Sequence, residues 1–451
     1  NYCNNHLDAD KALKDFFGYD KYRDLEGKPL QRDAVIDGIN GKSLLAVFPT
    51  GVGKSIAFQI PAFLSGIAEG GLTVVISPLQ ALMKDQVDSL VNKSTGGANA
   101  TTIHGSLNPI ERKAAFESVR NGQAHILYIA PETLRSKSIE TLLLTRNVVR
   151  FVIDEAHCFS SWGQDFRIEY QYIGKFIKKI EDERQTNIPV SCFTATAKPQ
   201  VIDDIKDYFK EHLALNFHEH IYSGTRKNLT FEVKLVKNDE DRYQQLRNLI
   251  ESCKEPTIIY VNRTKLSEEL AAKLTKDGYD ATYFHGKADK NQKLINQDEF
   301  IRGHVNIIVA TNAFGMGIDK DDVKMVIHYN ISSSLEDYVQ EAGRGGRKEG
   351  SHANCYVLYC QEDLNNHFSL LQMSKLLQTE IQQVWKALKK LSGRRTVINI
   401  TPFELAEAAG FSDTKGAETK VRTAVNELER AGYLTREQNN PTIFGNSLSV
   451  S

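Results

Sequence analysis

Short apolar runs alternate with amphipathic stretches along the first half of the chain. Residues 44–48, 72–77 and 148–153 are largely apolar runs of strand length, which predicts strands buried on both faces of a sheet. Residues 56–67 and 199–209 follow such runs, and we expect them to be helices. Repeated strand–helix units of this kind predict a parallel sheet with helices on both faces.

The alternation restarts after an irregular, polar stretch at residues 215–228, which is the expected linker. A strand is predicted at residues 257–261 and further strand–helix units follow it, but this block has no glycine-rich loop of its own. We therefore expect two tandem α/β lobes, the first at residues 1–215 and the second at residues 216–362. Because only the first lobe has a glycine-rich loop, we expect a nucleotide to bind in the cleft between the two lobes.

A different pattern follows in residues 363–451, where apolar positions recur with the period of a helix. Residues 368–391 predict one long helix with a basic end, and shorter helices are expected at residues 401–409 and 418–431. The order of these elements, two helices joined by a turn and followed by a short strand at 432–434, resembles a winged helix with an incomplete wing. A generic helical cap is the alternative. We expect a helical connector followed by a partial winged-helix-like region.

A glycine-rich loop joins the first apolar strand to the helix that follows it. The loop reads Pro49-Thr50-Gly51-Val52-Gly53-Lys54-Ser55. Backbone N–H groups in such a loop converge on a phosphate, and the helix N-terminus adds positive potential. Lys54 would reach the outer phosphates of a nucleoside triphosphate, and the Ser55 hydroxyl would hold Mg²⁺. Phe48 stands where the strict pattern has its first glycine, so an ordinary strand-to-helix turn is the alternative.

Two carboxylates follow the apolar strand at residues 148–153. Topology places Asp154 and Glu155 at the carboxyl end of a parallel sheet, where such sheets bind ligands. We expect Asp154 to hold Mg²⁺ and Glu155 to polarise the water that attacks the γ-phosphate. Arg344 and Arg347 lie three apart in a glycine-rich stretch, and a planar guanidinium can stabilise a transferring phosphoryl group. A solvated acidic turn and a surface basic turn are the respective alternatives.

Composition leaves the class of partner open. The 451 residues carry a net charge of −1, so nucleic-acid binding must come from local patches. No run approaches about 18 uninterrupted apolar residues, and neither a membrane-spanning helix nor a membrane partner is expected. The six cysteines form no CxxC pair, which favours free thiols in a reducing compartment over a zinc site. The first residues include neither Met nor a signal peptide, so we expect a fragment of a longer chain.

The ordered motifs resemble those of the RecQ family of DNA helicases, within helicase superfamily 2. They include the glycine-rich loop, the acidic pair in Asp154-Glu155-Ala156-His157 and the double arginines in Gln340-Glu341-Ala342-Gly343-Arg344-Gly345-Gly346-Arg347. The others are Ser77-Pro78-Leu79-Gln80-Ala81-Leu82-Met83-Lys84-Asp85-Gln86, Thr194-Ala195-Thr196-Ala197 and Ala310-Thr311-Asn312-Ala313-Phe314-Gly315-Met316-Gly317-Ile318-Asp319-Lys320. The most specific is the aromatic-rich stretch His157-Cys158-Phe159-Ser160-Ser161-Trp162-Gly163-Gln164-Asp165-Phe166-Arg167. The resemblance covers residues 13–362 and implies two RecA-like lobes with ATP and Mg²⁺ as cofactors.

The resemblance also implies a nucleotide site, residue by residue. Tyr19, Arg23 and Gln31 match the adenine-reading segment of the family. An extra stretch separates Arg23 from Gln31, so Lys28 is an alternative to Arg23 beside the base. The remaining cofactor-binding positions are Thr50, Gly51, Gly53, Lys54 and Ser55 in the loop and Gly317 and Asp319 in the second lobe.

Two features of the second half depart from the family pattern. Arg344 and Arg347 match the arginine-finger motif, with Arg347 as the expected finger, but Gly345 stands where the family usually has Ala. We expect this to be a small change. No cysteine follows Cys360, so the family's four-cysteine zinc module is missing and no zinc is expected. A helix at residues 364–395 replaces it.

Contact with single-stranded DNA is implied as well. Stacking of bases on Trp162 and Phe166, with Arg167 beside them, would hold a strand without reading its sequence. Further contacts to the DNA backbone are expected from Ser77, Gln80, Lys84 and His285. Single-stranded and tailed duplex DNA are the expected partners.

An ATP-dependent DNA helicase is the expected function. The resemblance implies translocation with 3′→5′ polarity, unwinding driven by ATP hydrolysis between the lobes, and a role in DNA repair and recombination. The missing zinc module leaves open a DNA-stimulated ATPase or ATP-switch subunit that separates no strands. An RNA helicase of the DEAD/DEAH kind is the nearest rival. We expect a monomer, in the cytoplasm with the nucleoid of a bacterium or in the nucleus of a eukaryote.

Overall fold

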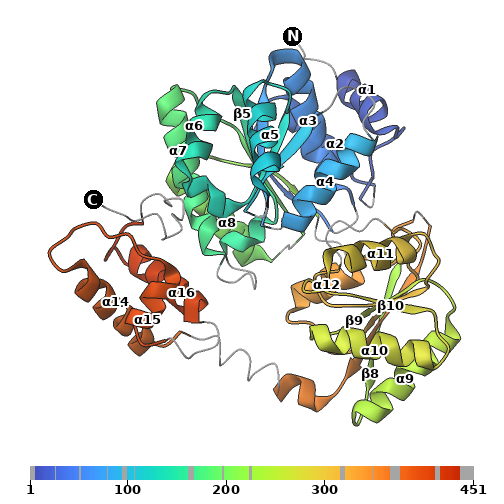
Figure 1. Cartoon of the computed structure of the whole chain (residues 1–451). Coiled ribbons are helices and arrows are strands. Elements are labelled where there is room, and N and C mark those ends of the chain that lie inside the picture. Colours follow the sequence, from blue (N-terminus) through green and yellow to red (C-terminus); the bar gives the residue numbers. More distant parts are fainter. Residues whose placement is uncertain are drawn as a thin grey trace. The chain divides into compact units, whose positions relative to one another are not determined.

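The structure, a computed structural model of the chain, is shown in Figure 1. It describes residues 6–25, 27–49, 52–78, 80–93, 99–105, 107–160, 167–195, 198–222, 226–314, 320–348, 350–365, 376–411 and 417–436. The chain divides into two compact units. The larger contains residues 1–134 and 138–363, and the smaller contains residues 135–137 and 364–451.

The first lobe of the larger unit is built on a parallel sheet of seven strands. Their order is β3-β4-β2-β5-β6-β1-β7. The strands are β1 (Leu44–Val47), β2 (Leu72–Ile76), β3 (Ala100–Ile103), β4 (Ile126–Ile129), β5 (Val148–Ile153), β6 (Val190–Thr194) and β7 (His218–Ile221). Side chains of β1 alternate between the two faces, so Val47 joins one apolar core and Ala46 the other. The sheet is buried on both faces, as its apolar runs predict.

Helices cover the two faces of this sheet in chain order. One core includes α1 (His6–Phe17), α2 (Leu30–Ile39), α3 (Lys54–Glu69) and α4 (Gln80–Lys93). The other includes α5 (Pro109–Arg120), α6 (Lys137–Leu144), α7 (Ile173–Arg184) and α8 (Pro199–Leu213). The described residues also form the short 3-10 helices η1 (Pro131–Arg135), η2 (Ala156–Phe159) and η3 (Ile168–Tyr172). Strand β7 lies beyond the expected lobe boundary at residue 215 and pairs with β1, so the first sheet continues to Ile221.

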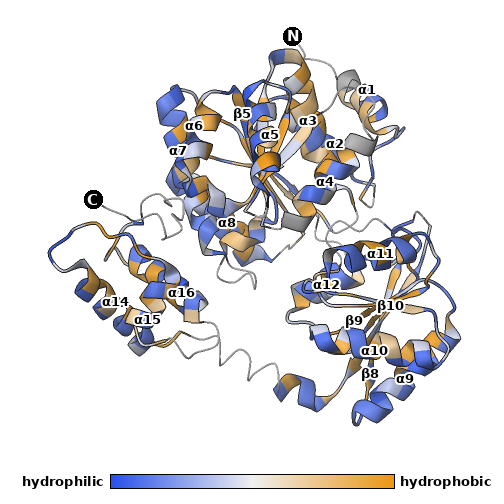
Figure 2. Cartoon of the chain, viewed as in Figure 1, coloured by the Kyte–Doolittle hydropathy of each residue, from blue (hydrophilic) through white to orange (hydrophobic). Residues whose placement is uncertain are grey.

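The second lobe is a parallel sheet of six strands in the order β10-β11-β9-β12-β13-β8. Its strands are β8 (Leu229–Leu235), β9 (Thr257–Tyr260), β10 (Ala281–Phe284), β11 (Ile307–Ala310), β12 (Met325–His328) and β13 (Ala353–Tyr359). On one face lie α9 (Asp239–Ser252) and α10 (Thr264–Lys276), and on the other α11 (Lys290–Ile301) and α12 (Leu335–Ala342). Figure 2 shows apolar strands enclosed by helices with polar outer faces. Two parallel α/β lobes confirm the predicted fold class.

The described part of the smaller unit contains three helices. They are α14 (Gln378–Ser392), α15 (Pro402–Ala408) and α16 (Ala417–Arg430), and they share an apolar core that contains Val384, Leu405 and Val421. The prediction of one long helix at residues 368–391 is wrong, because Leu376 and Leu377 are described and not helical, and α14 begins at Gln378. Residues 366–375 lie outside the described part. The strand predicted at 432–434 is wrong, because these residues pair with no other strand in the described part of the unit. The winged-helix interpretation stays a prediction.

A buried ion pair fixes the end of the second lobe. The Nη2 atom of Arg242 in α9 lies 2.7 Å from Oδ2 of Asp363, and the two side chains are only 5% and 6% exposed. Asp363 also accepts hydrogen bonds from the backbone N–H of Cys360 and the side-chain amide of Asn330. The Arg242 guanidinium lies over the ring of Tyr329. Asp363 is the last residue of the larger unit, so this pair holds the point where the chain leaves it.

The substitution Asp363→Ala should destabilise the second lobe by up to about 3–5 kcal/mol, because it removes the buried counter-ion of the Arg242 guanidinium and leaves only the exposed carboxylate of Asp239, 3.2 Å from Nη1. Hydrogen exchange of the α9 and β13 amides in the full chain measures this loss locally. The matched control is Asp298→Ala, which removes the exposed pair with Arg302 and should change protection by no more than about 0.5 kcal/mol. Equal protection in the two variants would contradict the role given to Asp363.

Candidate functional site

The glycine-rich loop lies between β1 and α3, as the sequence predicts. Gly53 precedes the helix with φ at 86°, a left-handed conformation that glycine adopts without strain. A Cβ atom on Gly53 would lie 2.7 Å from Nε2 of Gln31, so a larger residue would have to displace this side chain. Lys54 and Ser55 form the first turn of α3, where N–H groups and the helix dipole favour an anion. Thr50 and Gly51 lie outside the described residues.

Gln31 links the proposed adenine segment to this loop. Its side chain is 1% exposed, and its Nε2 donates to the carbonyl oxygens of Val52 and Gly53 at 3.0 and 2.9 Å. Its Oε1 accepts a hydrogen bond of 2.8 Å from the backbone N–H of Arg23. The loop and the segment at Arg23 are therefore joined by one buried amide, a connection that the sequence pattern did not reveal.

The other residues predicted near the base are on the surface. Tyr19 is 51% exposed, which leaves its ring open to stacking. Arg23 and Lys28 are both exposed, and Lys28 is held by a two-bond antiparallel bridge to Leu25. The choice between Arg23 and Lys28 beside the base stays a prediction.

The predicted acidic pair lies at the carboxyl end of β5. Glu155 has φ and ψ of 48°, a left-handed conformation that is unusual for a residue other than glycine. Its N–H donates to Oδ1 of Asp154 at 3.0 Å, and the Tyr170 hydroxyl donates to the Asp154 carbonyl at 2.9 Å. Strained backbone of this kind is tolerated where the surroundings hold it, and it is concentrated at functional sites.

Lys54 connects the loop to the acidic pair. Its Nζ lies 3.7 Å from Oε1 of Glu155. This nitrogen is buried and has no hydrogen-bond partner among the described residues. A buried ammonium without such partners is strongly favourable for a phosphate oxygen, so the residues present fit the triphosphate of ATP. Ser55 and Asp154 supply the oxygen ligands that Mg²⁺ requires.

The two carboxylates have different proton affinities. Burial, together with the charge of Glu155, raises the pKa of Asp154 to about 6. Burial also acts on Glu155, but the charge of Lys54 and the neighbouring His157 outweigh it and hold the pKa of Glu155 well below its usual range. Glu155 is therefore the carboxylate that stays ionised below pH 6, where Asp154 is protonated.

His157 and Thr194 belong to this site although no role was predicted for either. The Nδ1 atom of His157 lies 3.4 Å from Oε2 of Glu155 and 3.2 Å from Oγ1 of Thr194. Thr194 ends β6 and is fully buried. The acidic pair is thus connected through one imidazole to the motif at residues 194–197. Both residues stood in motifs quoted above, and only the strand order shows that the motifs meet.

The double arginines follow α12 in the second lobe. Burial lowers the pKa of Arg344, and the charges of Tyr260 and Glu155 act in the opposite direction. The charge of Arg344 in turn lowers the pKa of Glu155, so the structure brings this arginine within electrostatic range of the acidic pair. Both arginines lower the pKa of Tyr260, which burial raises. Arg347 as the finger stays a prediction, and Gly317 and Asp319 lie outside the described residues.

Gly345, which stands between the two arginines, is not freely exchangeable with the usual Ala. A Cβ atom on Gly345 would lie 2.8 Å from Cβ of Ala353 in β13, closer than real Cβ atoms approach. The next residue, Gly346, has φ at 58°. The expectation of a small change at Gly345 is therefore wrong, because β13 packs directly against this loop.

The residues predicted to contact DNA differ in their surroundings. Arg167 donates from Nη1 to the Pro78 carbonyl at 3.1 Å, which joins the segment after the acidic pair to the segment after β2. Lys84 is exposed, whereas Ser77 and His285 are only 1% and 3% exposed. His285 forms a 2.8 Å pair with Glu268. Contact of these residues with DNA stays a prediction. Trp162, Phe166 and the side chain of Gln80 lie outside the described part.

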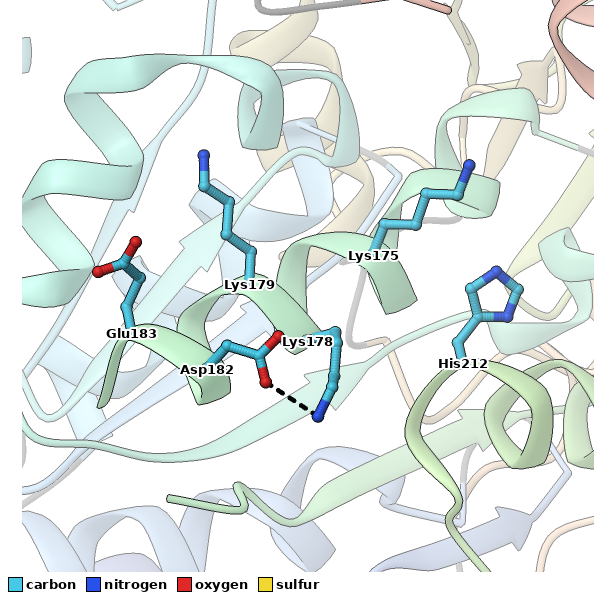
Figure 3. Close-up of a pocket in the computed structure, with 6 residues that line it drawn as sticks. All are labelled: Lys175, Lys178, Lys179, Asp182, Glu183 and His212. Atoms are coloured by element: carbon cyan, nitrogen blue, oxygen red, sulfur yellow. Dashed lines mark ion pairs between the residues drawn. The ribbon is translucent and has the colours of Figure 1, made fainter. Parts of the chain in front are cut away.

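A separate surface pocket of about 600 Å³ lies between α7 and α8 (Figure 3). It is lined by Lys175, Lys178, Lys179, Asp182, Glu183 and His212. Two of its lysines are engaged, since Lys178 pairs with Asp182 at 3.0 Å and Lys179 with Glu140 at 2.7 Å. None of the residues predicted to bind nucleotide or DNA lines it.

The described ranges contain neither a membrane-spanning helix nor a cluster of metal-binding side chains. None of the helices there combines the length and the apolarity needed to cross a bilayer. In the same ranges, no group of three or more His, Cys, Asp and Glu side chains is placed to hold an ion. The expected lack of zinc stays a prediction.

The raised pKa of Asp154 predicts a pH-dependent affinity for Mg²⁺. Below pH 6 Asp154 is protonated and must release its proton before it can bind the metal, so affinity should fall by up to roughly tenfold per pH unit. Isothermal titration of Mg²⁺ into the protein with bound ADP, from pH 5 to pH 8, measures this slope. Nucleotide phosphates also take up protons in this range, so the comparison is with Asp154→Asn, which should have the shallower slope. Equal slopes would contradict the prediction.

Comparison with known proteins agrees with the geometry. Residues 28–205 match the DEAD/DEAH box helicase family and residues 241–349 match the helicase conserved C-terminal domain. The chain is 32% identical to the probable ATP-dependent DNA helicase RecS of Bacillus subtilis, over 85% of this chain and 73% of that protein. It is 36% identical to the ATP-dependent DNA helicase RecQ of Synechocystis, over 82% of this chain and 76% of that protein.

A solved structure with a similar fold is the helicase MrfA bound to DNA and AMPPNP. Its TM-score is 0.63 at 18% identity, over 80% of this chain and 52% of that one. At this identity the likeness concerns the fold alone. The sequence relatives, by contrast, are similar over most of both chains, and they confirm the resemblance that the motifs carry: the chain belongs to the RecQ family of ATP-dependent DNA helicases.

Proposed function

We propose that the chain hydrolyses ATP to move along a DNA strand and to separate duplex DNA. One observation carries this proposal, in a chain of the RecQ family: Lys54 lies 3.7 Å from Glu155 of the acidic pair, and Glu155 is within electrostatic range of Arg344. They are contributed by the phosphate loop, by the end of β5 and by the second lobe. An ATP site that depends on both lobes can couple hydrolysis to their movement.

The residues of the site divide the chemistry among them. Lys54 and the N-terminus of α3 bind the phosphates, and Ser55 and Asp154 would hold Mg²⁺, which neutralises charge on the phosphates when bound. Because its pKa is held low, Glu155 is a weak base, and it acts by orienting and polarising the attacking water. Arg347 is the proposed finger on the transferring phosphoryl group. Arg344 helps to keep Glu155 ionised.

The DNA-binding part of the proposal rests on the stretch after the acidic pair. Arg167 and Pro78 tie this stretch to the segment that carries Ser77 and Lys84. Trp162 and Phe166 would stack on the bases of a single strand, and Lys84 would contact its phosphates. Family membership supports 3′→5′ movement, tailed duplex DNA as the substrate, and a role in DNA repair and recombination. We propose a zinc-free monomer that acts in the bacterial cytoplasm or in the eukaryotic nucleus, where its DNA lies.

Two other functions are distinguished by one experiment. ATPase activity is measured with single-stranded DNA, duplex DNA and RNA as stimulants, and strand displacement is measured on a 3′-tailed duplex. Stimulation by single-stranded DNA together with displacement supports the helicase. Stimulation without displacement supports a DNA-dependent ATP switch, and preference for RNA supports an RNA helicase.

The substitution Lys54→Ala should abolish ATP turnover and leave DNA binding in place, because it removes the buried charge that faces the phosphates. Turnover should fall by at least about 100-fold, since charge stabilisation of this kind contributes several kcal/mol. DNA-stimulated ATPase assays and binding to a labelled single strand measure the two effects. Lys113→Ala is the matched control, since Lys113 is an exposed lysine of the same lobe with no proposed part in binding, and it should keep both turnover and DNA binding. Native-like turnover in Lys54→Ala would refute the assignment.

A second prediction concerns Trp162. The chain has two tryptophans, so in a Trp385→Phe background the indole of Trp162 is the sole tryptophan reporter. Single-stranded DNA should quench its fluorescence by stacking. Trp162→Ala should uncouple ATP hydrolysis from DNA, so that basal turnover is retained and stimulation by DNA is lost. Unchanged stimulation would assign Trp162 to packing instead.

A further inference from the structure

Arg226 lies at the junction between the two sheets. Strand β7 of the first sheet ends at Ile221, and β8 of the second begins at Leu229. Arg226 therefore lies in the segment that connects the two lobes, within the linker predicted from the sequence at residues 215–228. Burial lowers the pKa of its guanidinium, and the positive charge of Arg23 in the first lobe lowers it further. Arg226 is partly buried, and a partly buried cation at a linker needs a structural or functional explanation.

The contacts of Arg226 are with the loop that carries the double arginines. Its Nη1 donates to the carbonyl oxygen of Gly343 at 2.8 Å, and its Nη2 donates to that of Gly346 at 2.5 Å. Its Nε donates to Oδ1 of Asn228 at 3.3 Å. The two carbonyls belong to the residues directly before Arg344 and directly before Arg347. One planar guanidinium therefore spans the loop between both functional arginines.

Asn228 completes this arrangement. Its side-chain amide donates to the carbonyls of Gly346 and Ser351, each at 2.8 Å. The Gly346 carbonyl thus accepts from both Arg226 and Asn228. Two side chains of the linker therefore hold the loop that carries Arg344 and Arg347. The same loop packs closely against β13, where a Cβ atom on Gly345 would lie 2.8 Å from Cβ of Ala353.

A glycine-rich loop needs such restraint to place an arginine. Glycine has the largest conformational freedom of any residue, and a loop with three glycines would sample many positions of Arg344 and Arg347. Groups that stabilise a transition state must be held within a fraction of an ångström, and a misplacement of about 1 Å can cost about 100-fold in rate. The guanidinium fork of Arg226 matches two carbonyls at once, which the single ammonium of a lysine cannot do.

We propose that Arg226 is a positioning residue: it fixes the arginine loop to the linker between the lobes, so that a movement of the linker moves Arg344 and Arg347. This deepens the proposed function and rests on it. Arg226 touches neither ATP nor DNA in this role. It acts on the rate of hydrolysis through the loop, and nucleotide affinity does not depend on it.

The test compares Arg226→Lys and Arg226→Gln with the native chain in DNA-stimulated ATPase assays. We expect kcat to fall by about 10- to 100-fold, with KM for ATP and affinity for single-stranded DNA within twofold of native. Arg302→Lys is the matched control, an exposed arginine of the same lobe, and should be native-like in every measurement. A raised KM with unchanged kcat, or native kcat in both variants, would overturn the proposal.

A double-mutant cycle separates positioning from general packing. In a chain that carries Arg344→Ala and Arg347→Ala, the further change Arg226→Lys should have no additional effect on the residual kcat, because the groups that it positions are gone. An undiminished effect in that background would assign Arg226 to folding and sink the proposal. If the native chain itself shows no DNA-stimulated hydrolysis, the proposed function fails instead, so the two failures are distinguishable.

Discussion

The interaction between Lys54 and Glu155 is the constraint on which the site depends. A buried ammonium and a buried carboxylate are costly alone, and each is tolerable because the other is near. Their pairing requires that the start of α3 and the end of β5 meet at the same edge of the sheet. Strand order provides this, because β6 alone separates β1 from β5. The site is therefore a property of the sheet rather than of any single motif.

The pair is also incomplete. Lys54 has unused hydrogen-bonding capacity among the described residues, and Glu155 is held in a left-handed backbone conformation. Such features cost stability unless a ligand or the surrounding structure compensates for them. His157 and Thr194 support the carboxylate from one side and Arg344 acts from the second lobe. A phosphate group would accept the hydrogen bonds that the Lys54 ammonium can still donate, and binding it would offset the cost of the strained backbone at Glu155.

Much of the fold could be predicted from the sequence because parallel strands buried on both faces leave an unmistakable apolar signature. The lobes and the acidic pair at the end of β5 follow from it. The boundary between the lobes could not be predicted in this way, because β7 (His218–Ile221) is a short strand of mixed polarity that is recognised only by its pairing with β1. The prediction of a strand at 432–434 was wrong because a local apolar pattern does not show whether a second strand lies beside it, and none pairs with these residues in the described part of the chain. Gln31, His157 and Arg226 were missed as connections because hydrogen bonds between residues far apart in the sequence leave no periodic signal.

The contact between Gly345 and Ala353 has a consequence for how related chains can vary. The space between them holds one methyl group, that of Ala353. Alanine at position 345 would therefore require glycine at position 353 or a displacement of β13. The two positions lie in different motifs, one in the arginine loop and one in β13, yet they share a single volume. Their residues should change together, as a pair of small side chains whose combined size is fixed by the distance between a loop and a strand.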